Sequence, residues 1–256
     1  MRLILSSKMI KSYLNKFKKT LLDGLFPIEC LSCNRDGRWI WKKCLRKIYI
    51  RTIDNCPACK KESIYGKTHE WCIRKTQLDG MIVAVSFKDR ILQDAVHKLK
   101  YSYIKDLSTP LSEILARKII ELDTKDDLPN LVSLLISENP IIIPVPLHKK
   151  RLRKRDFNQA ELLSRKISTK FNLEHQSGIL KRVKYTKPQT ELKKNERKIN
   201  VSGVFEVDIE WKSKLKNTKI ILVDDVATTG STLNDSARAL KECGALEVWG
   251  LVLARG

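Results

Sequence analysis

The stretch ILVDDVATTGST, residues 221–232, decides the fold class and the candidate site. It begins with apolar residues typical of a buried strand, and two adjacent carboxylates, Asp224 and Asp225, follow. Open α/β folds bind ligands where their parallel strands end. A loop of small and hydroxyl residues that enters a helix offers free backbone amides and the positive end of the helix dipole, which suit a phosphate. The stretch therefore predicts a phosphate-binding loop next to an acid pair.

The two acids determine what else this site would hold. Carboxylates repel a phosphate, so they must accept hydrogen bonds from a group attached to it, and vicinal sugar hydroxyls fit. The expected ribose-phosphate site consists of Asp224, Asp225, Ala227, Thr228, Thr229, Gly230, Ser231 and Thr232. An ordinary strand-to-helix turn with a Ser/Thr cap is the alternative, and it explains the glycine and the hydroxyls but not the paired acids.

Apolar runs and helical patterns alternate along the rest of the chain. Strands are expected at 81–87, 141–146, 220–225 and 244–254, and helices at 91–100, 111–122, 158–168 and 231–244. Strand, helix and strand in repetition imply a parallel sheet with helices on both faces. The predicted fold class is therefore α/β, in a domain of residues 79–256.

Six of the seven cysteines fall between residues 30 and 72. No apolar run approaches the roughly 18 residues needed to cross a bilayer, and no signal-peptide core is evident, so we expect a cytoplasmic protein without a transmembrane segment. In a reducing compartment such clustering indicates metal rather than disulfides. A small reduced apolar cluster is the alternative.

The cysteine spacing predicts a zinc ribbon module at residues 29–78. Cys56-x2-Cys59 and His69-x2-Cys72 supply four ligands on two short turns, as tetrahedral zinc requires. A second set is incomplete, because Trp41 stands where its fourth ligand would fall. The members of this second set are Cys30, Cys33 and Cys44. Structural zinc would stabilise a module that is too small to form a sufficient core.

The chain is strongly basic, with 50 Lys and Arg against 29 Asp and Glu and a formal net charge of +21. Residues 147–200 contain 17 Lys and Arg and 5 Asp and Glu, so more than half of the net charge lies in about a fifth of the chain. This excess favours polyanions, although a solvated lysine-rich surface is the alternative. The residues expected to bind pyrophosphate or nucleic acid are His148, Lys149, Lys150, Arg151, Arg155 and Arg197, and the first five are expected in a loop at 148–155. Residues 1–28 predict a basic amphipathic helix that docks on the protein itself or on anionic lipid.

These motifs resemble those of known proteins. Residues 221–232 resemble the phosphoribosyl pyrophosphate motif of type I phosphoribosyltransferases. Together with the cysteine-rich module, the chain resembles the ComF family of competence-associated proteins, in which a double zinc ribbon precedes a phosphoribosyltransferase-like domain. Further matches to the family pattern are Pro144 to Leu147, Phe157 to Ala160, Thr186, Gln189, Glu196, Arg197 and Asn200. Asp156 stands where the family usually has glycine, and His69 and Trp41 stand where it has cysteines.

The resemblance implies a function. It implies that the acid pair and the loop bind phosphoribosyl pyrophosphate with magnesium, and that the protein handles single-stranded DNA with the DNA-uptake machinery during natural transformation. A catalytically active phosphoribosyltransferase in nucleotide or base salvage is the alternative. The sequence identifies no nucleophile or general base, and the number of bound zinc ions stays open. Residues 185–200 are expected to form a mobile hood over the site.

Overall fold

The computed structural model describes residues 27–123, 139–184 and 203–256. The chain divides into two compact units, residues 1–47 and 48–256. The described part of the smaller unit contains helix α2 (Lys42–Lys47). Nearly all of the helix expected at 1–28, and the whole hood expected at 185–200, lie outside the described residues.

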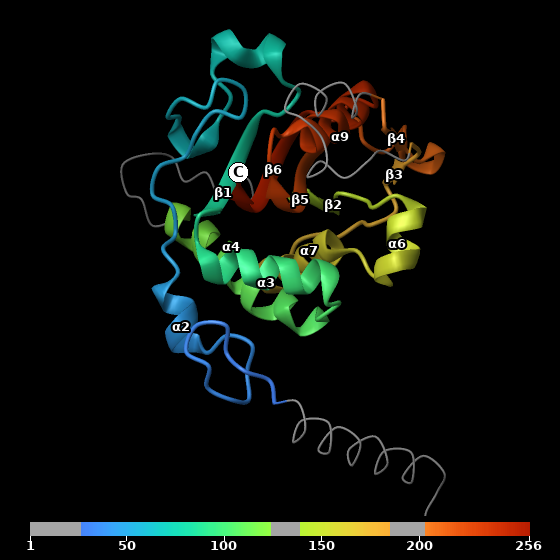
Figure 1. Ribbon diagram of the computed structural model, residues 1–256. Helices are drawn as coiled ribbons and strands as arrows, with labels where there is room; N and C mark the ends of the chain where they lie inside the picture. The colour runs from blue at the N-terminus through green and yellow to red at the C-terminus, as the bar shows by residue number, and fades with distance from the viewer. Residues whose placement is uncertain (1–26, 124–138, 185–202) are drawn as a thin grey trace, which may run out of the picture. The chain divides into compact units, whose positions relative to one another are not determined.

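A four-stranded sheet forms the centre of the larger unit, in the order β1-β6-β5-β2 (Figure 1). All three pairings are parallel, which confirms the predicted sheet. Its strands are β1 (Gly80–Ser86), β2 (Ile141–Pro144), β5 (Lys219–Ala227) and β6 (Glu247–Arg255). Strand β5 is central, so its carboxyl end lies between the ends of β2 and β6.

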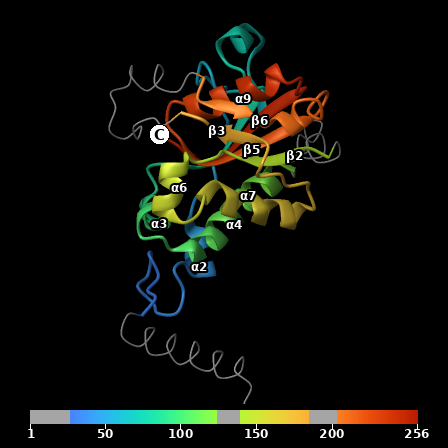
Figure 2. The same ribbon diagram turned by 90° about the vertical axis from the view of Figure 1, so that its right-hand side faces the viewer.

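Helices cover both faces of this sheet, as predicted. Figures 1 and 2 show α9 (Ser231–Glu242) on one face, with the antiparallel pair β3 (Leu180–Arg182) and β4 (Phe205–Val207) beside it. The opposite face carries the other three long helices of the described residues. They are α3 (Arg90–Tyr101), α4 (Ser108–Asp123) and α7 (Gln159–Phe171). The site at the strand ends is therefore built on a rigid three-layer frame.

The connections include short helices. The cationic segment expected as a loop at 148–155 is instead a helix, α6 (Lys149–Arg155). The change has a local cause, since His148 caps its first turn and Asp156 ends it in a left-handed conformation. The 3-10 helices are η1 (Ile64–Gly66), η2 (Glu70–Lys75), η3 (Lys105–Leu107) and η5 (Ile209–Trp211).

At Gly80, strand β1 packs so closely against β6 that a side chain would not fit. Gly80 lies opposite Trp249 in the strand register. A Cβ atom on Gly80 would lie 2.1 Å from Cζ3 of the buried indole. Glycine is therefore required here for close packing, although its backbone conformation is ordinary.

A buried ion pair fastens the cysteine-rich segment of the larger unit to α4. Lys118 is fully buried, and its ammonium lies 2.9 Å from Oδ2 of Asp54, whose carboxylate is also buried. The same ammonium donates to the carbonyl of Arg51 at 2.6 Å. These contacts fix the segment that leads into Cys56.

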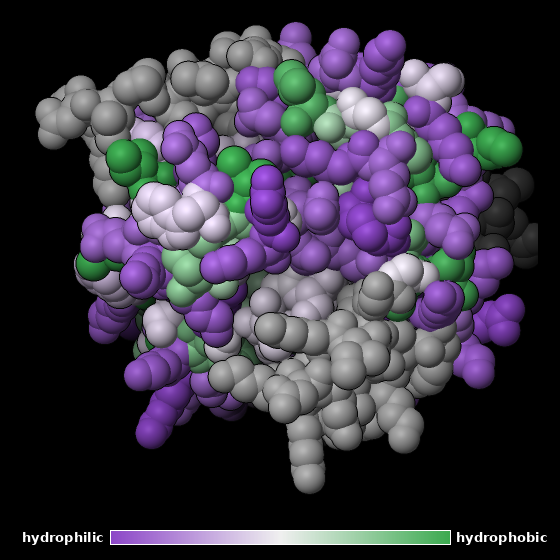
Figure 3. Space-filling model, turned by 90° about the horizontal axis from the view of Figure 1, so that it is seen from above, coloured by the Kyte–Doolittle hydropathy of each residue, from purple (hydrophilic) through white to green (hydrophobic). Residues whose placement is uncertain are grey.

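None of the helices in the described residues is both long and apolar enough to span a membrane. The face of the molecule seen in Figure 3 is mostly hydrophilic, and apolar side chains form separate small patches on it.

Replacing Lys118 with alanine tests the contribution of the buried pair. Loss of one partner leaves the Asp54 carboxylate buried without its cation, so we expect the free energy of unfolding to fall by about 3–5 kcal/mol. Urea unfolding of the full chain measures the change. Lys170→Ala, at an exposed position of α7, should stay within about 0.5 kcal/mol of the parent. A Lys118→Ala protein as stable as that control would contradict this role.

Candidate functional site

The acid pair lies near the carboxyl end of β5, as the sequence predicted for this stretch. Successive side chains of a strand point to opposite faces, so the two carboxylates have different surroundings. Asp225 is only 2% exposed, and its Oδ2 lies 2.9 Å from the ammonium of Lys100 in the last turn of α3. Asp224 is half-buried. Asp224 is therefore the more accessible acid. Asp225 is paired with Lys100 on the face of the sheet that α3 covers.

Burial and the neighbouring charge of Asp225 raise the pKa of Asp224 to about 7, and the Lys100 ammonium opposes this rise. The second cation near this acid is Arg182, at the end of β3. Burial and the charge of Arg151 lower the pKa of Arg182 to about 10, whereas Asp224 acts in the opposite direction. Arg182 therefore interacts electrostatically with both Asp224 and Arg151 of α6.

The loop after the acids runs from Ala227, the last residue of β5, into the first turn of α9. Gly230 adopts a left-handed φ of 82° and precedes the helix without a side-chain cap. The Ser231 amide bonds the hydroxyl of Thr229 at 3.3 Å. Among the described residues, none accepts a hydrogen bond from the amides of Thr229 and Gly230. The loop therefore presents open donors at the positive end of a helix.

The cations of α6 follow β2, the strand that pairs with β5. His148 caps this helix, since its Nδ1 accepts from the Lys150 amide at 3.2 Å. Burial and then the nearby charge of Arg182 lower the pKa of His148. Arg155 lies over the ring of Tyr101 and bonds Gln159 at 3.0 Å. Arg197, also predicted to bind pyrophosphate, lies outside the described residues.

Asp156 occupies the position where the resembled family has glycine, and the structure gives the reason for that preference. Its φ is 64°, a left-handed conformation that glycine adopts without cost and that Asp tolerates better than most residues. The side chain is 89% exposed and pairs with Lys105 at 3.1 Å. This pairing offsets the negative charge that Asp156 adds beside α6.

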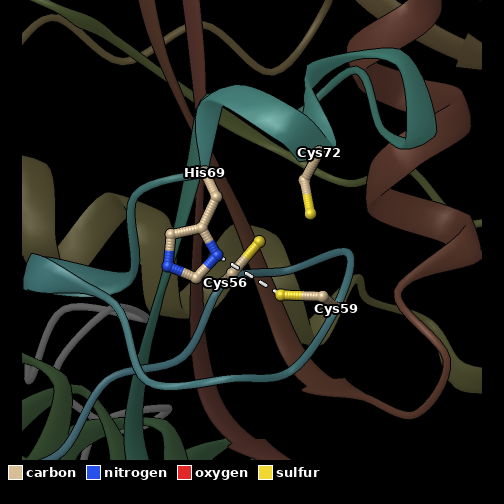
Figure 4. Close-up of side chains that lie close together, drawn as sticks. All are labelled: Cys56, Cys59, His69 and Cys72. Atoms are coloured by element: carbon tan, nitrogen blue, oxygen red, sulfur yellow. Dashed lines mark hydrogen bonds between the residues drawn. The ribbon is translucent and has the colours of Figure 1, made fainter.

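The predicted four-ligand set comes together in space (Figure 4). One donor atom from each of Cys56, Cys59, His69 and Cys72 lies within 4.8 Å of every other. Nδ1 of His69 faces the sulfurs, at 3.3 Å from Sγ of Cys59, and Nε2 lies 3.1 Å from the Glu62 carbonyl. A proton on Nε2 would leave Nδ1 free for a metal, as in histidine ligands with a carbonyl partner.

The protonation of these thiols also fits a metal ligand set. Burial opposes ionisation of Cys56, but hydrogen bonds from the backbone amides of Cys59, His69 and Ala58 lower its pKa below the ordinary value. Burial and the two neighbouring cysteines raise the pKa of Cys72 to about 11. A divalent cation would remove this mutual repulsion, so the group could hold zinc.

The incomplete set also converges, within the described part of the smaller unit. The sulfurs of Cys30, Cys33 and Cys44 lie within 4.8 Å of one another. Trp41 does not act as a ligand; its indole donates to the Arg35 carbonyl at 3.3 Å. This group could hold a metal through three protein ligands, with a further ligand from outside the set.

Sequence analysis missed two cations at the acid pair, Lys100 and Arg182. Lys100 is the last basic residue of an amphipathic helix, and Arg182 lies in a short strand before a basic segment. Basic residues in such positions are common at protein surfaces, so no sequence pattern marked these two. Only the folded structure shows that Lys100 pairs with Asp225 and that the charges of Arg182 and Asp224 interact.

Replacing Cys59 with alanine removes one ligand of the four-ligand group. We expect the purified protein to lose about one equivalent of zinc and to unfold at a lower temperature, because metal binding stabilises the fold. Elemental analysis and thermal unfolding measure the two effects. Cys243→Ala, which lies outside both cysteine groups, should change neither. Equal zinc content in the two variants would contradict the assignment.

Comparison with known proteins shows which proteins this chain is similar to. A phosphoribosyl transferase domain model matches residues 158–256. Competence protein F of Haemophilus influenzae is 40% identical over 115 residues. These residues span 44% of this chain and 50% of that relative's length. DNA utilization protein YhgH of Escherichia coli K12 is 28% identical over 76% of this chain and 82% of the relative. Competence protein ComFC of Bacillus subtilis is 26% identical over 86% and 92%. These matches support the resemblance to ComF-family proteins with a phosphoribosyltransferase-like domain.

Proposed function

We propose that this protein binds phosphoribosyl pyrophosphate or a related ribose phosphate at the carboxyl end of β5, and that it takes part in DNA uptake by handling single-stranded DNA. The observation that carries the proposal is the placement of three unlike groups along one edge of the sheet. They are an accessible acid, an open amide loop and a set of cations.

Each group suits one part of such a ligand. The Asp224 carboxylate would accept hydrogen bonds from ribose hydroxyls, and the amides of Thr229 and Gly230 would bind the 5'-phosphate. Asp225 is the second predicted ribose contact. Its ion pair with Lys100 supports a role in fixing the end of β5 against α3. Direct contact of Asp225 with ribose stays a prediction.

The pyrophosphate would lie on the side of β2. Arg182 and the cations of α6, Lys149, Lys150, Arg151 and Arg155, would bind it there, because charge-assisted hydrogen bonds to phosphate oxygens are strong. Magnesium would enter with the pyrophosphate and neutralise part of its charge. The protein residues would orient the chain of phosphates and stabilise charge on a departing pyrophosphate.

The DNA role is supported by charge and by the relatives. The excess of positive charge attracts a polyanion, and the names of two relatives concern competence while a third concerns DNA utilization. A cytoplasmic location and partners in the DNA-uptake machinery belong to the same proposal. A salvage phosphoribosyltransferase is the second candidate, favoured by the domain match alone.

Asp224→Asn separates the ribose site from a polyanion surface. We expect the dissociation constant for phosphoribosyl pyrophosphate with magnesium to rise about tenfold or more, because each hydrogen bond to a charged group contributes about 1.5–3 kcal/mol. Affinity for single-stranded DNA should stay level or rise, because a negative charge is removed. Calorimetric titration, with DNA binding at two salt concentrations, measures both.

The matched control for this variant is Asp94→Asn, at an exposed position of α3. It removes the same charge away from the strand ends and should leave phosphoribosyl pyrophosphate binding unchanged. Equal binding by the parent and Asp224→Asn would rule out the ribose site. Loss of DNA affinity in Asp224→Asn would instead indicate that the acid supports the fold of the DNA-binding surface.

The raised pKa of Asp224 predicts a pH dependence. The ionised carboxylate is the better acceptor for ribose hydroxyls, so affinity for ribose 5-phosphate should increase as the pH rises through about 7. The ligand phosphate loses its second proton near pH 6 and also contributes. Titrations between pH 5.5 and 8.5 should show the upper step in the parent and lose it in Asp224→Asn. Identical profiles would show that Asp224 does not contact the ligand.

A further inference from the structure

A pocket separates the four-ligand cysteine group from the loop after β5. Its volume is about 360 Å³, and Asp224 and Asp225 do not line it. One wall is formed by Pro57 and Ala58, which lie between two of the metal-binding cysteines, and the opposite wall by Thr229 to Ser231. Gly230 leaves its mouth open, since no atom lies within 4 Å of the place of a Cβ.

Arg255, the last residue of β6, connects the two walls. Its backbone pairs in register with Ala227, where the phosphate loop begins. Its Nη2 donates to the Pro57 carbonyl at 2.8 Å. The Nε and Nη1 atoms are buried, and no other described residue accepts a hydrogen bond from them. A buried guanidinium with unused donors is costly, which implies a missing negative partner.

Metal-bound thiolates supply such a partner. Three thiolates and one neutral histidine around Zn²⁺ carry one net negative charge. Cys56 and Cys59 flank Pro57, whose carbonyl accepts from Arg255, so the negative charge of a loaded metal centre would lie close to the guanidinium. The loaded metal centre therefore fits the guanidinium that links it to the loop.

A second link runs from the other metal-binding turn. After Cys72, Thr76 and Gln77 both donate to the Asn234 side chain, at 2.8 and 2.7 Å. Asn234 lies in the first turn of α9, where its amide bonds the Gly230 carbonyl at 2.9 Å. Both metal-binding turns are thus fastened to the same loop, each by its own hydrogen bonds.

We propose that this pocket is a binding site for a compact oxyanion, phosphate or a phosphate ester, and that zinc at the four-ligand group assembles it through Arg255. Zinc occupancy and oxyanion affinity are then thermodynamically linked, and each increases the other by the same factor. The inference rests on the proposed function only in taking residues 228–231 as a phosphate loop.

The charges of the lining support this ligand class. The cations are Lys75, Arg238 and Arg255, and the single acid is Asp235. That acid is already used, since it accepts from the amides of Gly203, Val204 and Phe205 and pairs with Arg238 at 2.9 Å. The ammonium of Lys75 has no partner among the described residues and lies at the pocket wall. Arg238 also pairs with Glu242, so the ammonium of Lys75 and the amides of Thr229 and Gly230 are the donors left for an anion.

The first experiment titrates the full chain with inorganic phosphate, once loaded with zinc and freed of excess metal and once after chelation. We expect the zinc-loaded protein to bind phosphate at least about fivefold more tightly, within the usual range of coupling. The reciprocal experiment measures zinc affinity by chelator competition with and without sulfate, which should tighten zinc binding. Equal phosphate affinity in the two metal states would overturn the inference.

Single substitutions separate this link from loss of folding. Arg255→Gln should lower zinc affinity about tenfold, because it removes the hydrogen bond that supports the turn between Cys56 and Cys59, and should also weaken phosphate binding. Arg255→Lys keeps the charge and should restore part of both. Lys75→Gln should weaken phosphate binding alone, and Lys170→Gln on the opposite face of the sheet should change neither. Arg255→Gln with unchanged zinc and phosphate affinities would contradict the role of Arg255.

The outcomes also separate this inference from the ribose-phosphate site. A zinc-loaded protein that binds neither phosphate nor phosphoribosyl pyrophosphate would refute the phosphate loop, and both proposals with it. Binding of both ligands with the same affinity before and after chelation would leave the ribose-phosphate site standing and refute the zinc link.

Discussion

The parallel pairing of β5 between β2 and β6 is the constraint on which the rest depends. Parallel strands end at one edge, so residues from three distant parts of the sequence must meet there. The helix after β2 brings cations, the end of β5 brings two acids and the loop, and the end of β6 brings Arg255. Each group would be an ordinary surface feature without the sheet.

Charge balance at this edge explains how two adjacent carboxylates are tolerated. Two acids cannot both ionise cheaply in a partly buried place unless cations compensate them. Lys100 pairs with Asp225 on the face covered by α3, and the charge of Arg182 in β3 interacts with Asp224. Asp224 is left with a pKa close to neutrality. The two acids therefore differ, since Asp225 is buried and paired with Lys100 whereas Asp224 is more accessible.

The sequence predicted what depends on local pattern. Residues 221–232 predicted the strand, the loop and the start of α9 at Ser231, and cysteine spacing predicted the four-ligand group, because three-residue turns bring their ligands together by themselves. Lys100, Arg182 and Arg255 could not be found in this way, since their partners lie far away in the sequence. The expected cationic loop at 148–155 was wrong because its capping residue and the left-handed Asp156 favour a helix.

The position of the four-ligand group argues that it does more than stabilise a small module. Its leading segment is held by the buried ammonium of Lys118, and its two turns are joined to the loop after β5 through Arg255 and Asn234. Directional hydrogen bonds of this kind transmit position, since a shift at one end breaks the geometry at the other. If the group holds zinc and the loop binds phosphate, as proposed, the metal would therefore help to set the position of the loop.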